Sequence, residues 1–168
     1  VQKKANIKSF RTKAILCVDN TTRTLGKLAN IYRHKFNIPF IAVAGSNGKT
    51  TTKEMIASVL GTKYSVLCTQ GNLNNYVGVP QTLFRLNDEH EVAVLEIGTN
   101  HFGELKYLCE ILEPTHGLIT NVGHEHLEFF KKLNGVARAE GELFQALEES
   151  GLGFVNADDK HVVSKAKK

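Results

Sequence analysis

The sequence predicts an α/β fold in which a P-loop-type, mostly parallel sheet carries helices on both faces. Five short apolar runs rich in β-branched residues are typical of strands buried on both faces: 14–18, 40–44, 92–97, 117–120 and 153–155. Segments with apolar residues at helical spacing separate these runs. Because strands and helices alternate, a parallel sheet with crossover helices follows. The 168 residues suffice for one domain with a full core.

The helical segments are recognised by apolar residues at positions i, i+3 and i+4. They cover residues 22–35, 51–60, 103–112 and 135–147. In the first segment, four apolar residues share one face: Leu25, Leu28, Ala29 and Tyr32. A weaker strand candidate is 65–68, and the stretch 69–79 is rich in Gly and Asn and too polar to form part of the core.

The composition excludes several classes of protein. A hydrophobic fraction of 42% and a charged fraction of 23% argue against disorder, collagen-like repeats and coiled coils. No apolar run reaches the roughly 18 residues that cross a bilayer, and no signal-peptide pattern opens the chain. Cys17, Cys68 and Cys109 lie in apolar stretches without a C-x-x-C pair, so we expect buried thiols rather than disulfides or a zinc knuckle. We therefore expect a cytoplasmic protein without membrane insertion.

The net charge of +4 is concentrated at the two ends of the chain. Five basic residues lie within residues 1–13 and four within residues 160–168, whereas residues 14–159 hold 12 basic and 17 acidic residues. A nucleic-acid-binding protein normally carries its positive charge on the folded surface. The distribution therefore argues against nucleic acid as a partner.

The strongest motif joins a buried strand to a glycine-containing loop and then to a helix that opens with Lys-Thr. Gly45 and Gly48 allow backbone angles and close approaches that a Cβ would prevent. Successive N–H groups can then point at a phosphate, assisted by the positive end of the helix dipole. Lys49 would reach the β- and γ-phosphates of ATP, and the Thr50 hydroxyl would bind Mg²⁺. The nucleotide-binding set is Gly45, Ser46, Asn47, Gly48, Lys49, Thr50 and Thr51.

The loop departs from the general phosphate-binding pattern G-x-x-x-x-G-K-[ST], because the first glycine of that pattern would fall on Val43. It is a variant of the form G-x-x-G-K-T-T. The alternative is a glycine turn followed by a chance Lys-Thr pair, but the predicted strand before the loop and the predicted helix after it favour phosphate binding.

The variant loop resembles that of the Mur ligase superfamily of ATP-dependent amide-forming ligases. Five further motifs follow in the order and at spacings similar to the family's: residues 71–80, 96–104, 120–128, 135–144 and 155–159. The double-Asn loop in the first motif and Glu-x-Gly-x-Asn-His in the second resemble the MurF branch. Members of that branch add D-alanyl-D-alanine to UDP-N-acetylmuramoyl-tripeptide. The resemblance covers about residues 14–159.

The resemblance implies a reaction, its partners and a domain arrangement. The tripeptide carboxylate attacks the γ-phosphate of ATP to form an acyl phosphate, and the amine of D-alanyl-D-alanine then displaces phosphate to give the amide. Residues 1–18 would be the end of an N-terminal UDP-sugar domain or a linker, and residues 19–168 the central ATP-binding domain, incomplete at its C-terminal end. The C-terminal ligase domain would be absent, so we expect this fragment to be an inactive monomer.

Two side chains are expected to complete a magnesium site with Thr50. Glu96 ends an apolar run, where the strand ends of a parallel sheet form the ligand crevice and a charge is costly unless it is bound. The alternative for Glu96 is a helix-capping or surface glutamate. The resemblance makes His126 a ligand of a second magnesium, although a loop histidine considered without it is more often structural. The order His-Glu-His-Leu at residues 124–127 does not give the spacing H-E-x-x-H, which excludes a zinc-protease site.

Three asparagines in a glycine loop are candidates for binding the substrate: Asn72, Asn74 and Asn75. The resemblance places this loop against the muramoyl-peptide substrate and near the γ-phosphate. Turn chemistry is an equal alternative for any one of them, because Asn tolerates left-handed backbone angles. His101 and His116 receive no role, and His124 and Glu125 are expected to be exposed loop residues.

The clearest departure from the family concerns Glu140. Many Mur ligases carry a lysine fourteen or fifteen residues after the magnesium-binding histidine, and its carbamate helps to bind the second magnesium. Fourteen residues after His126 this chain has Glu140, whose carboxylate supplies an anion without modification. Its shorter side chain would act through a water bridge; the alternative is an ordinary helix-surface residue. The expected catalytic set is thus Lys49, Glu96, His126 and Glu140.

Two other functions stay open on the sequence. The first is another ligase on the same scaffold, such as a folylpolyglutamate or cyanophycin synthetase, against which the double-Asn loop argues. The second is a P-loop module that binds nucleotide without ligase chemistry, although such a module has no evident need for both Glu96 and His126 near the γ-phosphate.

Overall fold

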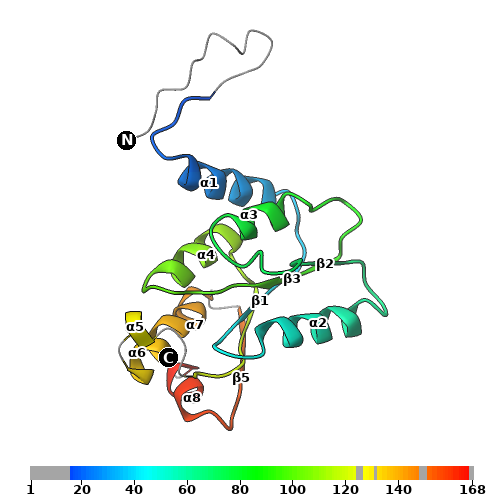
Figure 1. The fold of residues 1–168 in the computed structure, drawn as a ribbon. Helices are drawn as coiled ribbons and strands as arrows, with labels where there is room; N and C mark the ends of the chain where they lie inside the picture. Colours follow the sequence, from blue (N-terminus) through cyan, green and yellow to red (C-terminus); the bar gives the residue numbers. More distant parts are fainter. Residues whose placement is uncertain (1–15, 124–126, 131, 148–150, 167–168) are drawn as a thin grey trace.

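A five-stranded parallel sheet forms the centre of the computed structural model, which describes residues 16–123, 127–130, 132–147 and 151–166 (Figure 1). The strands are β1 (Phe40–Ala44), β2 (Val66–Cys68), β3 (Val92–Glu96), β4 (His116–Ile119) and β5 (Leu152–Val155). They lie in the order β2-β3-β1-β4-β5, and every pair of neighbours is parallel. The predicted parallel sheet is confirmed.

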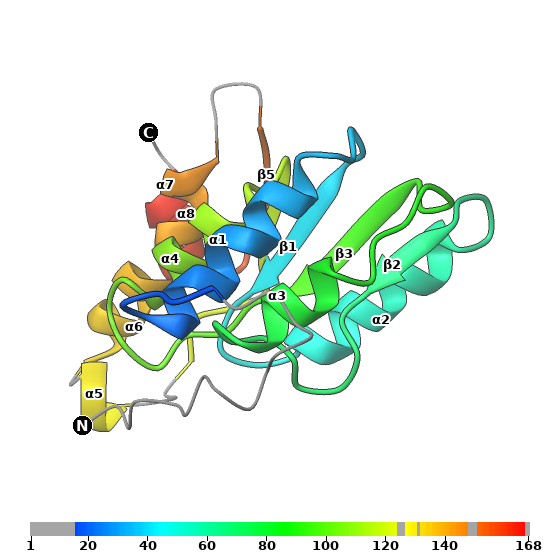
Figure 2. The same ribbon diagram turned by 90° about the horizontal axis from the view of Figure 1, so that it is seen from above.

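Helices cover both faces of this sheet. They are α1 (Thr21–Arg33), α2 (Lys49–Leu60), α3 (Gly78–Leu83), α4 (Glu104–Leu112), α5 (Leu127–Phe130), α6 (Leu133–Glu140), α7 (Glu142–Ala146) and α8 (Lys160–Ala166). Helices α1, α3 and α4 lie on one face and α2 lies on the other, while α7 packs against α4 and β4 (Figures 1 and 2). The α/β class with helices on both faces is therefore confirmed.

The central strand β1 is apolar throughout because both of its faces are covered. Phe40, Ala42 and Ala44 belong to the main core cluster, and Val43 on the opposite face is also fully buried. The chain forms β3 on one side of β1 and then β4 on the other. The carboxyl ends of these three strands therefore meet at one edge of the sheet, which is where open α/β sheets bind ligands.

Helix α1 packs on α3 and α4 through a face that differs in part from the predicted one. Ala29 is fully buried as predicted, but Leu28 is 46% exposed and Gly26 is buried instead. A Cβ on Gly26 would lie 2.6 Å from the Tyr107 hydroxyl oxygen and 2.8 Å from Ile111 Cδ1. Glycine therefore permits the close approach of α1 to α4, which the spacing of apolar residues could not indicate.

Two of the predicted buried strands differ in the structure. Residues 16–18 form no strand, and Leu16 is 73% exposed. Residues 14 and 15 lie outside the described residues. Strand β5 pairs with β4, and all four of its residues are exposed, so it is not buried on both faces. An apolar run becomes a buried strand only where neighbouring strands and covering helices are present. The domain boundary proposed at residue 18 stays a prediction.

The three cysteines have different environments. Cys109 in α4 is buried as predicted, and burial raises the pKa of its thiol to about 12. Cys68 at the end of β2 is half-buried, and burial raises the pKa of this thiol as well. Cys17 is exposed, so the prediction of a buried thiol is wrong at this position because the apolar run around it forms no strand.

The helical segments also show differences in detail. Residues 135–147 form parts of two helices, α6 and α7, with Gly141 between them. Helices α3, α5 and α8 are absent from the sequence prediction because each has only four to seven residues, too few for apolar periodicity to show. Among the described residues, no helix is both long and apolar enough to cross a membrane.

Candidate functional site at the carboxyl edge of the sheet

The turn between β1 and α2 has a backbone that favours glycine at two positions. Gly45 has a φ of +117°, and Gly48, which is the N-cap of α2, has a φ of +80°. Residues with a side chain rarely adopt these angles. A Cβ on Gly45 would in addition clash with Thr120 Oγ1. The two glycines thus allow the chain to leave a buried strand and start a helix at the sheet edge, where N–H groups of the first turn are available to an anion.

Lys49 places its ammonium group over this turn. Its Nζ donates to the carbonyl oxygen of Gly45 at 2.6 Å and to that of Ser46 at 2.8 Å. Positive charge from the side chain and from the helix N-terminus therefore converges on the same turn. Such a site favours a polyanion.

A second loop, which follows β4, braces the turn. Asn121 accepts a hydrogen bond from Ser46 N–H through its carbonyl oxygen at 2.9 Å and one from Asn47 N–H through Oδ1 at 3.1 Å. Asn121 Nδ2 donates to the Asn47 carbonyl oxygen at 2.9 Å, as does Thr120 Oγ1 at 2.7 Å. Gly123 N–H donates to Ser46 Oγ at 2.8 Å. These contacts fix the turn before any ligand binds, and Thr51 beside it is exposed.

Beyond the second loop lies a segment that follows β5. Asn156 Nδ2 donates to the Thr120 carbonyl oxygen at 2.9 Å, and Asp159 accepts from Val122 N–H at 2.7 Å. Burial would raise the pKa of Asp159, but hydrogen bonds from backbone N–H groups, that of Val122 among them, outweigh it and hold this pKa below its ordinary value. The motif at residues 155–159 thus stabilises the loop after β4, which in turn holds the turn between β1 and α2.

A buried carboxylate faces the start of α2 from the end of β3. Glu96 is 2% exposed, and its Oε2 accepts a hydrogen bond from Thr50 Oγ1 at 2.8 Å. Its Oε1 accepts one from Asn74 Nδ2 at 2.8 Å. A hydroxyl and a carboxylate that converge in this way are the oxygen ligands that Mg²⁺ prefers, so these residues fit a magnesium ion. Glu96 is neither a helix cap nor a surface residue.

The three candidate asparagines have different environments. Asn74 contacts Glu96, as described, and also lines the cavity beside the turn. Asn75 Oδ1 accepts from the N–H groups of Val77 and Gly78 at 3.0 Å each, which is turn chemistry at the start of α3. Asn72 is exposed. The structure therefore brings one of the three, Asn74, to the buried carboxylate.

Glu140 is not a helix-surface residue. It is 5% exposed, and its Oε2 accepts a hydrogen bond from Gly45 N–H at 2.8 Å. Two residues later, Glu142 accepts from Gly103 N–H at 2.9 Å and from Lys106 N–H at 3.0 Å, so it caps the first turn of α4. His126, and with it His124 and Glu125, lies outside the described residues.

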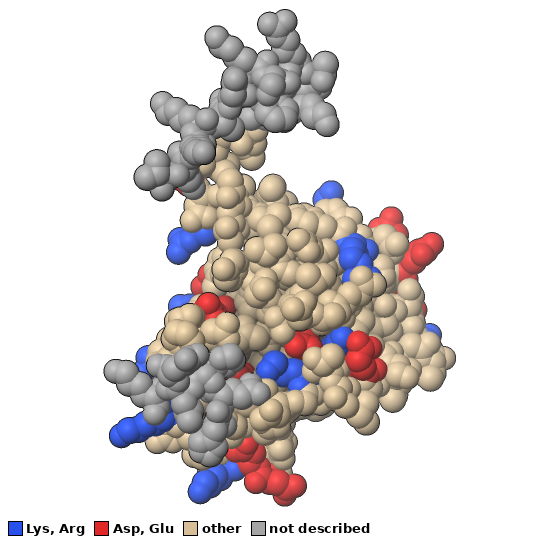
Figure 3. Space-filling model, in the orientation of Figure 1, with Lys and Arg blue, Asp and Glu red and all other residues tan. Residues whose placement is uncertain are grey.

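Several of these groups line a cavity of about 370 Å³. It is lined by parts of the turn at residues 45–50 (the phosphate turn), the segment at residues 69–75 (the asparagine segment), the residues after β3, and nearby helices. The lining residues are Ser46, Lys49, Asn74, Asn75, Tyr76, Gly98, Thr99, Asn100, His101, Glu104, Tyr107, Leu108, Phe130, Val136 and Glu140. On the face shown in Figure 3, basic and acidic side chains are interspersed.

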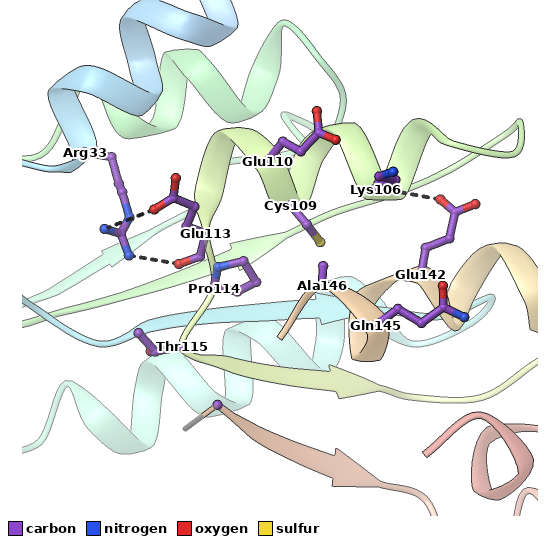
Figure 4. Close-up of a pocket in the computed structure, with 11 residues that line it drawn as sticks. Arg33, Lys106, Cys109, Glu110, Glu113, Pro114, Thr115, Glu142, Gln145 and Ala146 are labelled. Atoms are coloured by element: carbon purple, nitrogen blue, oxygen red, sulfur yellow. Dashed lines mark hydrogen bonds and ion pairs between the residues drawn. The ribbon is translucent and has the colours of Figure 1, made fainter. Parts of the chain in front are cut away.

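A larger cavity, of about 710 Å³, lies near the start of β4 (Figure 4). Arg33 lines it and donates to the carbonyl oxygens of Leu112 and Glu113 at 2.9 Å and 2.8 Å, so it closes the C-terminal end of α4. Glu110, Glu113 and Glu142 contribute carboxylates to this cavity. Because a helix C-terminus disfavours anions and backbone carbonyls there already engage Arg33, the larger cavity is the weaker candidate for a phosphate site.

Comparisons with known proteins identify the family of this chain. The family model described as the Mur ligase middle domain matches residues 43–168. The chain belongs to the Mur ligase family. Two curated Mur ligase relatives, named UDP-N-acetylmuramoyl-tripeptide--D-alanyl-D-alanine ligase, are each 43% identical to it. The protein from Haemophilus influenzae aligns over 88% of this chain and 33% of its own length, and that from Escherichia coli over 86% and 32%.

Solved Mur ligase structures share the fold. A crystal structure of MurF from Acinetobacter baumannii is 39% identical, with a TM-score of 0.86 over 90% of this chain and 34% of its own. The MurF ligase from Thermotoga maritima, in complex with ADP, is 31% identical, with a TM-score of 0.86 over 93% of this chain and 36% of its own. The present chain thus spans about a third of the length of the relatives that it matches.

Some functional contacts have no signal in the sequence. The bracing role of Asn121 and the capping role of Glu142 depend on partners 74 and 39 residues away. Lys53 in α2 is fully buried, and Thr69 after β2 is 1% exposed. A lysine in an amphipathic helix is ordinarily solvated, so only the fold reveals its burial.

Proposed function

We propose that this chain is the nucleotide-binding portion of an ATP-dependent ligase that adds D-alanyl-D-alanine to UDP-N-acetylmuramoyl-tripeptide. Such an enzyme forms an amide bond in peptidoglycan precursor synthesis. The observation that carries the proposal is the convergence of Lys49, Thr50 and Glu96 at the end of two neighbouring strands. Family membership, and the names of the relatives at 43% identity, support the choice of substrates.

The proposed reaction has two steps. The tripeptide carboxylate attacks the γ-phosphorus of ATP, so ADP leaves and an acyl phosphate forms. The amine of D-alanyl-D-alanine then attacks the acyl carbon, a proton leaves the nitrogen, and inorganic phosphate departs as the amide forms. The first step brings two anions together, and positioning with charge neutralisation carries most of such phosphoryl transfers.

The residues of this chain supply that neutralisation. The N–H groups at the start of α2 and the ammonium of Lys49 bind the β- and γ-phosphates. Thr50 and Glu96 would hold Mg²⁺, which when bound neutralises charge on the phosphate oxygens. Asn74 donates to the Glu96 carboxylate and so orients it. His126 is proposed as a ligand of a second magnesium.

Glu140 is proposed as the anion that supports the second magnesium site. It takes the place of the carbamylated lysine of other Mur ligases. Burial of its carboxylate behind the phosphate turn, at 5% exposure and in contact with Gly45 N–H, supports a role at the site. A fixed carboxylate there needs no reaction with CO₂.

A different Mur-type ligase is the second candidate. A pseudomurein peptide ligase type C from Methanothermus fervidus shares the fold, but its TM-score of 0.68 and identity of 28% are lower than those of the MurF structures. This difference favours the MurF-type substrates.

A chimaera tests the substrate choice. The segment of the Escherichia coli ligase that aligns with this chain is replaced by this chain, and phosphate release is measured with each acceptor. We expect release only when both UDP-N-acetylmuramoyl-tripeptide and D-alanyl-D-alanine are present. A folded chimaera that releases phosphate with glutamate or another single amino acid would instead support the second candidate.

A further inference from the structure

Lys53 is a charged residue with no exposed surface, and the proposed reaction does not use it. It lies in α2, four residues and about one turn after Lys49. A buried ammonium group is costly unless it is paired and hydrogen-bonded. The partners of Lys53 therefore indicate what this side chain does.

Lys53 joins α2 to the end of a neighbouring strand. Its Nζ donates to the Thr69 carbonyl oxygen at 2.8 Å, and Thr69 is the residue that follows β2. The same Nζ forms an ion pair with Glu54, whose side chain is 62% exposed. One carboxylate at the surface thus balances the charge, while the ammonium itself holds a backbone carbonyl in the interior.

Thr69 connects Lys53 to the candidate magnesium site through two further hydrogen bonds. Its N–H donates to the Val94 carbonyl oxygen at 3.1 Å, which secures it to β3. Its Oγ1 accepts from the N–H of Glu96 at 3.1 Å. A continuous series of hydrogen bonds therefore runs from α2 through Lys53 and Thr69 to the backbone of the buried carboxylate.

The asparagine segment begins at the same point. After Thr69 the chain turns through Asn74, which donates to the Glu96 carboxylate and accepts a hydrogen bond from Gly98 N–H at 2.9 Å. One end of this segment is held by Lys53 and the other by Glu96. The position of Asn74 relative to the phosphate turn therefore depends on both attachments.

We propose that Lys53 is a positioning residue that couples the phosphate-binding helix to the asparagine segment and to Glu96. It does not contact substrate. It sets the distance between the groups on α2, which face the phosphates, and those on the segment at 69–75, which face the acceptor. Its role in catalysis rests on the proposed function, whereas the coupling itself does not.

A purely structural role would give a different result on substitution. Methionine has a similar length and volume to lysine, and apolar replacements of buried charges are often neutral or stabilising. A structural lysine replaced by methionine would therefore leave the order of the segment unchanged. A positioning lysine would leave the fold intact and loosen only the segment that it holds.

Amide hydrogen exchange of Lys53→Met separates the two roles. The control is Lys63→Met, which removes an exposed lysine three residues past the end of the same helix. We expect the amides of Glu96 and Gly98 to exchange at least about tenfold faster in Lys53→Met than in wild type. We expect Thr120, whose N–H donates to Ala44 in the other half of the sheet, to be unchanged in both variants. Equal exchange at Glu96 and Gly98 in all three proteins would overturn the proposal.

Two further measurements distinguish a failure of the proposed coupling from a failure of the proposed function. In wild type, we expect a slowly exchanging NMR signal from the Lys53 ammonium, and its absence would overturn the proposal even if the variant does not fold. Affinity for the nonhydrolysable ATP analogue AMP-PNP is then measured with and without Mg²⁺. We expect Lys53→Met to lose more of the Mg²⁺-dependent part than Lys63→Met does. A wild type that binds no nucleotide would count against the proposed function, while the exchange result would still decide the coupling.

Discussion

The two cavities of this protein differ in size and, more importantly, in what their side chains can bind. The smaller, at the carboxyl edge of the sheet, is lined by the glycine turn, by Lys49 at the start of α2 and by Asn74, which donates to the buried Glu96 carboxylate. The larger lies at the C-terminal end of α4, where Arg33 is engaged by backbone carbonyls and three glutamates contribute negative charge. The convergence of the Lys49 ammonium and a helix N-terminus on one turn therefore points to the smaller cavity as the nucleotide site.

The contrast between the two cavities shows that volume is a poor guide to the site in an open parallel sheet. A ligand needs groups that converge on it, and in this topology the carboxyl ends of β1 and β3 provide them. The larger cavity has the space, but it lies at the C-terminal end of α4, where Arg33 is already engaged by backbone carbonyls (Figure 4). The following predictions concern the groups at and around the carboxyl edge of the sheet.

The largest expected effect is the absence of ligation by this 168-residue chain alone. A complete site must hold both acceptor and nucleotide, and positioning of reactants is worth roughly 7–11 kcal/mol of the barrier. This chain aligns with about a third of the length of its relatives, so we expect no measurable turnover from it. Phosphate release is measured with ATP, UDP-N-acetylmuramoyl-tripeptide and D-alanyl-D-alanine. Turnover that requires both acceptors would show that the smaller cavity and its surroundings suffice.

The next effect concerns nucleotide affinity. Lys49→Ala removes a charge-assisted contact to phosphate, which is worth roughly 1.5–3 kcal/mol, so we expect binding to weaken by about 10- to 150-fold. Titration calorimetry with ATP and Mg²⁺ measures it. The matched control is Lys106→Ala, because Lys106 is an exposed lysine that lines the larger cavity. Equal weakening in both variants would remove the distinction between the cavities.

A smaller effect is expected for Glu140→Gln in a protein that joins this segment to both flanking domains of a relative. Glutamine keeps an oxygen that can accept from Gly45 N–H but removes the charge. We expect kcat to fall at least about tenfold, since the loss of one electrostatic contact at a phosphoryl-transfer site commonly has this size or more. An unchanged kcat at limiting Mg²⁺ would reject the metal-supporting role.

Bicarbonate provides an independent test of the same residue. Because Glu140 carries its own carboxylate, we expect wild-type activity to be indifferent to added bicarbonate. We expect Glu140→Lys to gain bicarbonate dependence where its carbamate reaches the position of the glutamate. Activity of the wild type that rises with bicarbonate would contradict the substitution of a carbamylated lysine by glutamate.

The smallest effect concerns the pH dependence of stability. Asp159 accepts hydrogen bonds from Val122, His161 and Val162, and its pKa lies below the ordinary value of 3.8. Its contribution is therefore fully present above pH 3.8 and is lost as the pH falls through the lowered pKa. We expect Asp159→Ala to lower the free energy of unfolding by about 1 kcal/mol at neutral pH, as loss of a helix cap does.

Urea unfolding at several pH values checks the Asp159 prediction. The difference between wild type and Asp159→Ala should narrow below pH 3.8, and the exposed neighbour provides the control, Asp158→Ala. A difference that does not change with pH would mean that the carboxylate charge contributes nothing to the brace.

Much of the site could be predicted because its signals are local in sequence. The run at 40–44, the two glycines and the Lys-Thr pair lie within a dozen residues, and the structure forms β1, the turn and α2 from them. Glu96 was expected at a strand end, and it lies there at 2% exposure. Apolar residues and glycines can be recognised within a single segment, without knowledge of the distant residues that it contacts.

The rest depends on contacts between distant segments. Nothing near Asn74 or Asn75 distinguishes them, yet one contacts a carboxylate 22 residues away and the other forms a turn. Burial of Lys53 depends on Thr69, which follows β2 and lies 16 residues later. The run at 16–18 is apolar but finds no neighbouring strand. Such outcomes are decided by packing, which periodicity does not encode.

The central claim is that Mg-nucleotide binds at the carboxyl edge and not at the larger cavity. Backbone amide NMR spectra of the ¹⁵N-labelled chain are recorded during titration with AMP-PNP and Mg²⁺. We expect the largest shifts at residues 45–50, with further shifts at Asn74, Glu96 and Gly98, and unshifted signals at Arg33, Cys109 and Glu113. Shifts concentrated at the last three residues, with an unshifted phosphate turn, would contradict it.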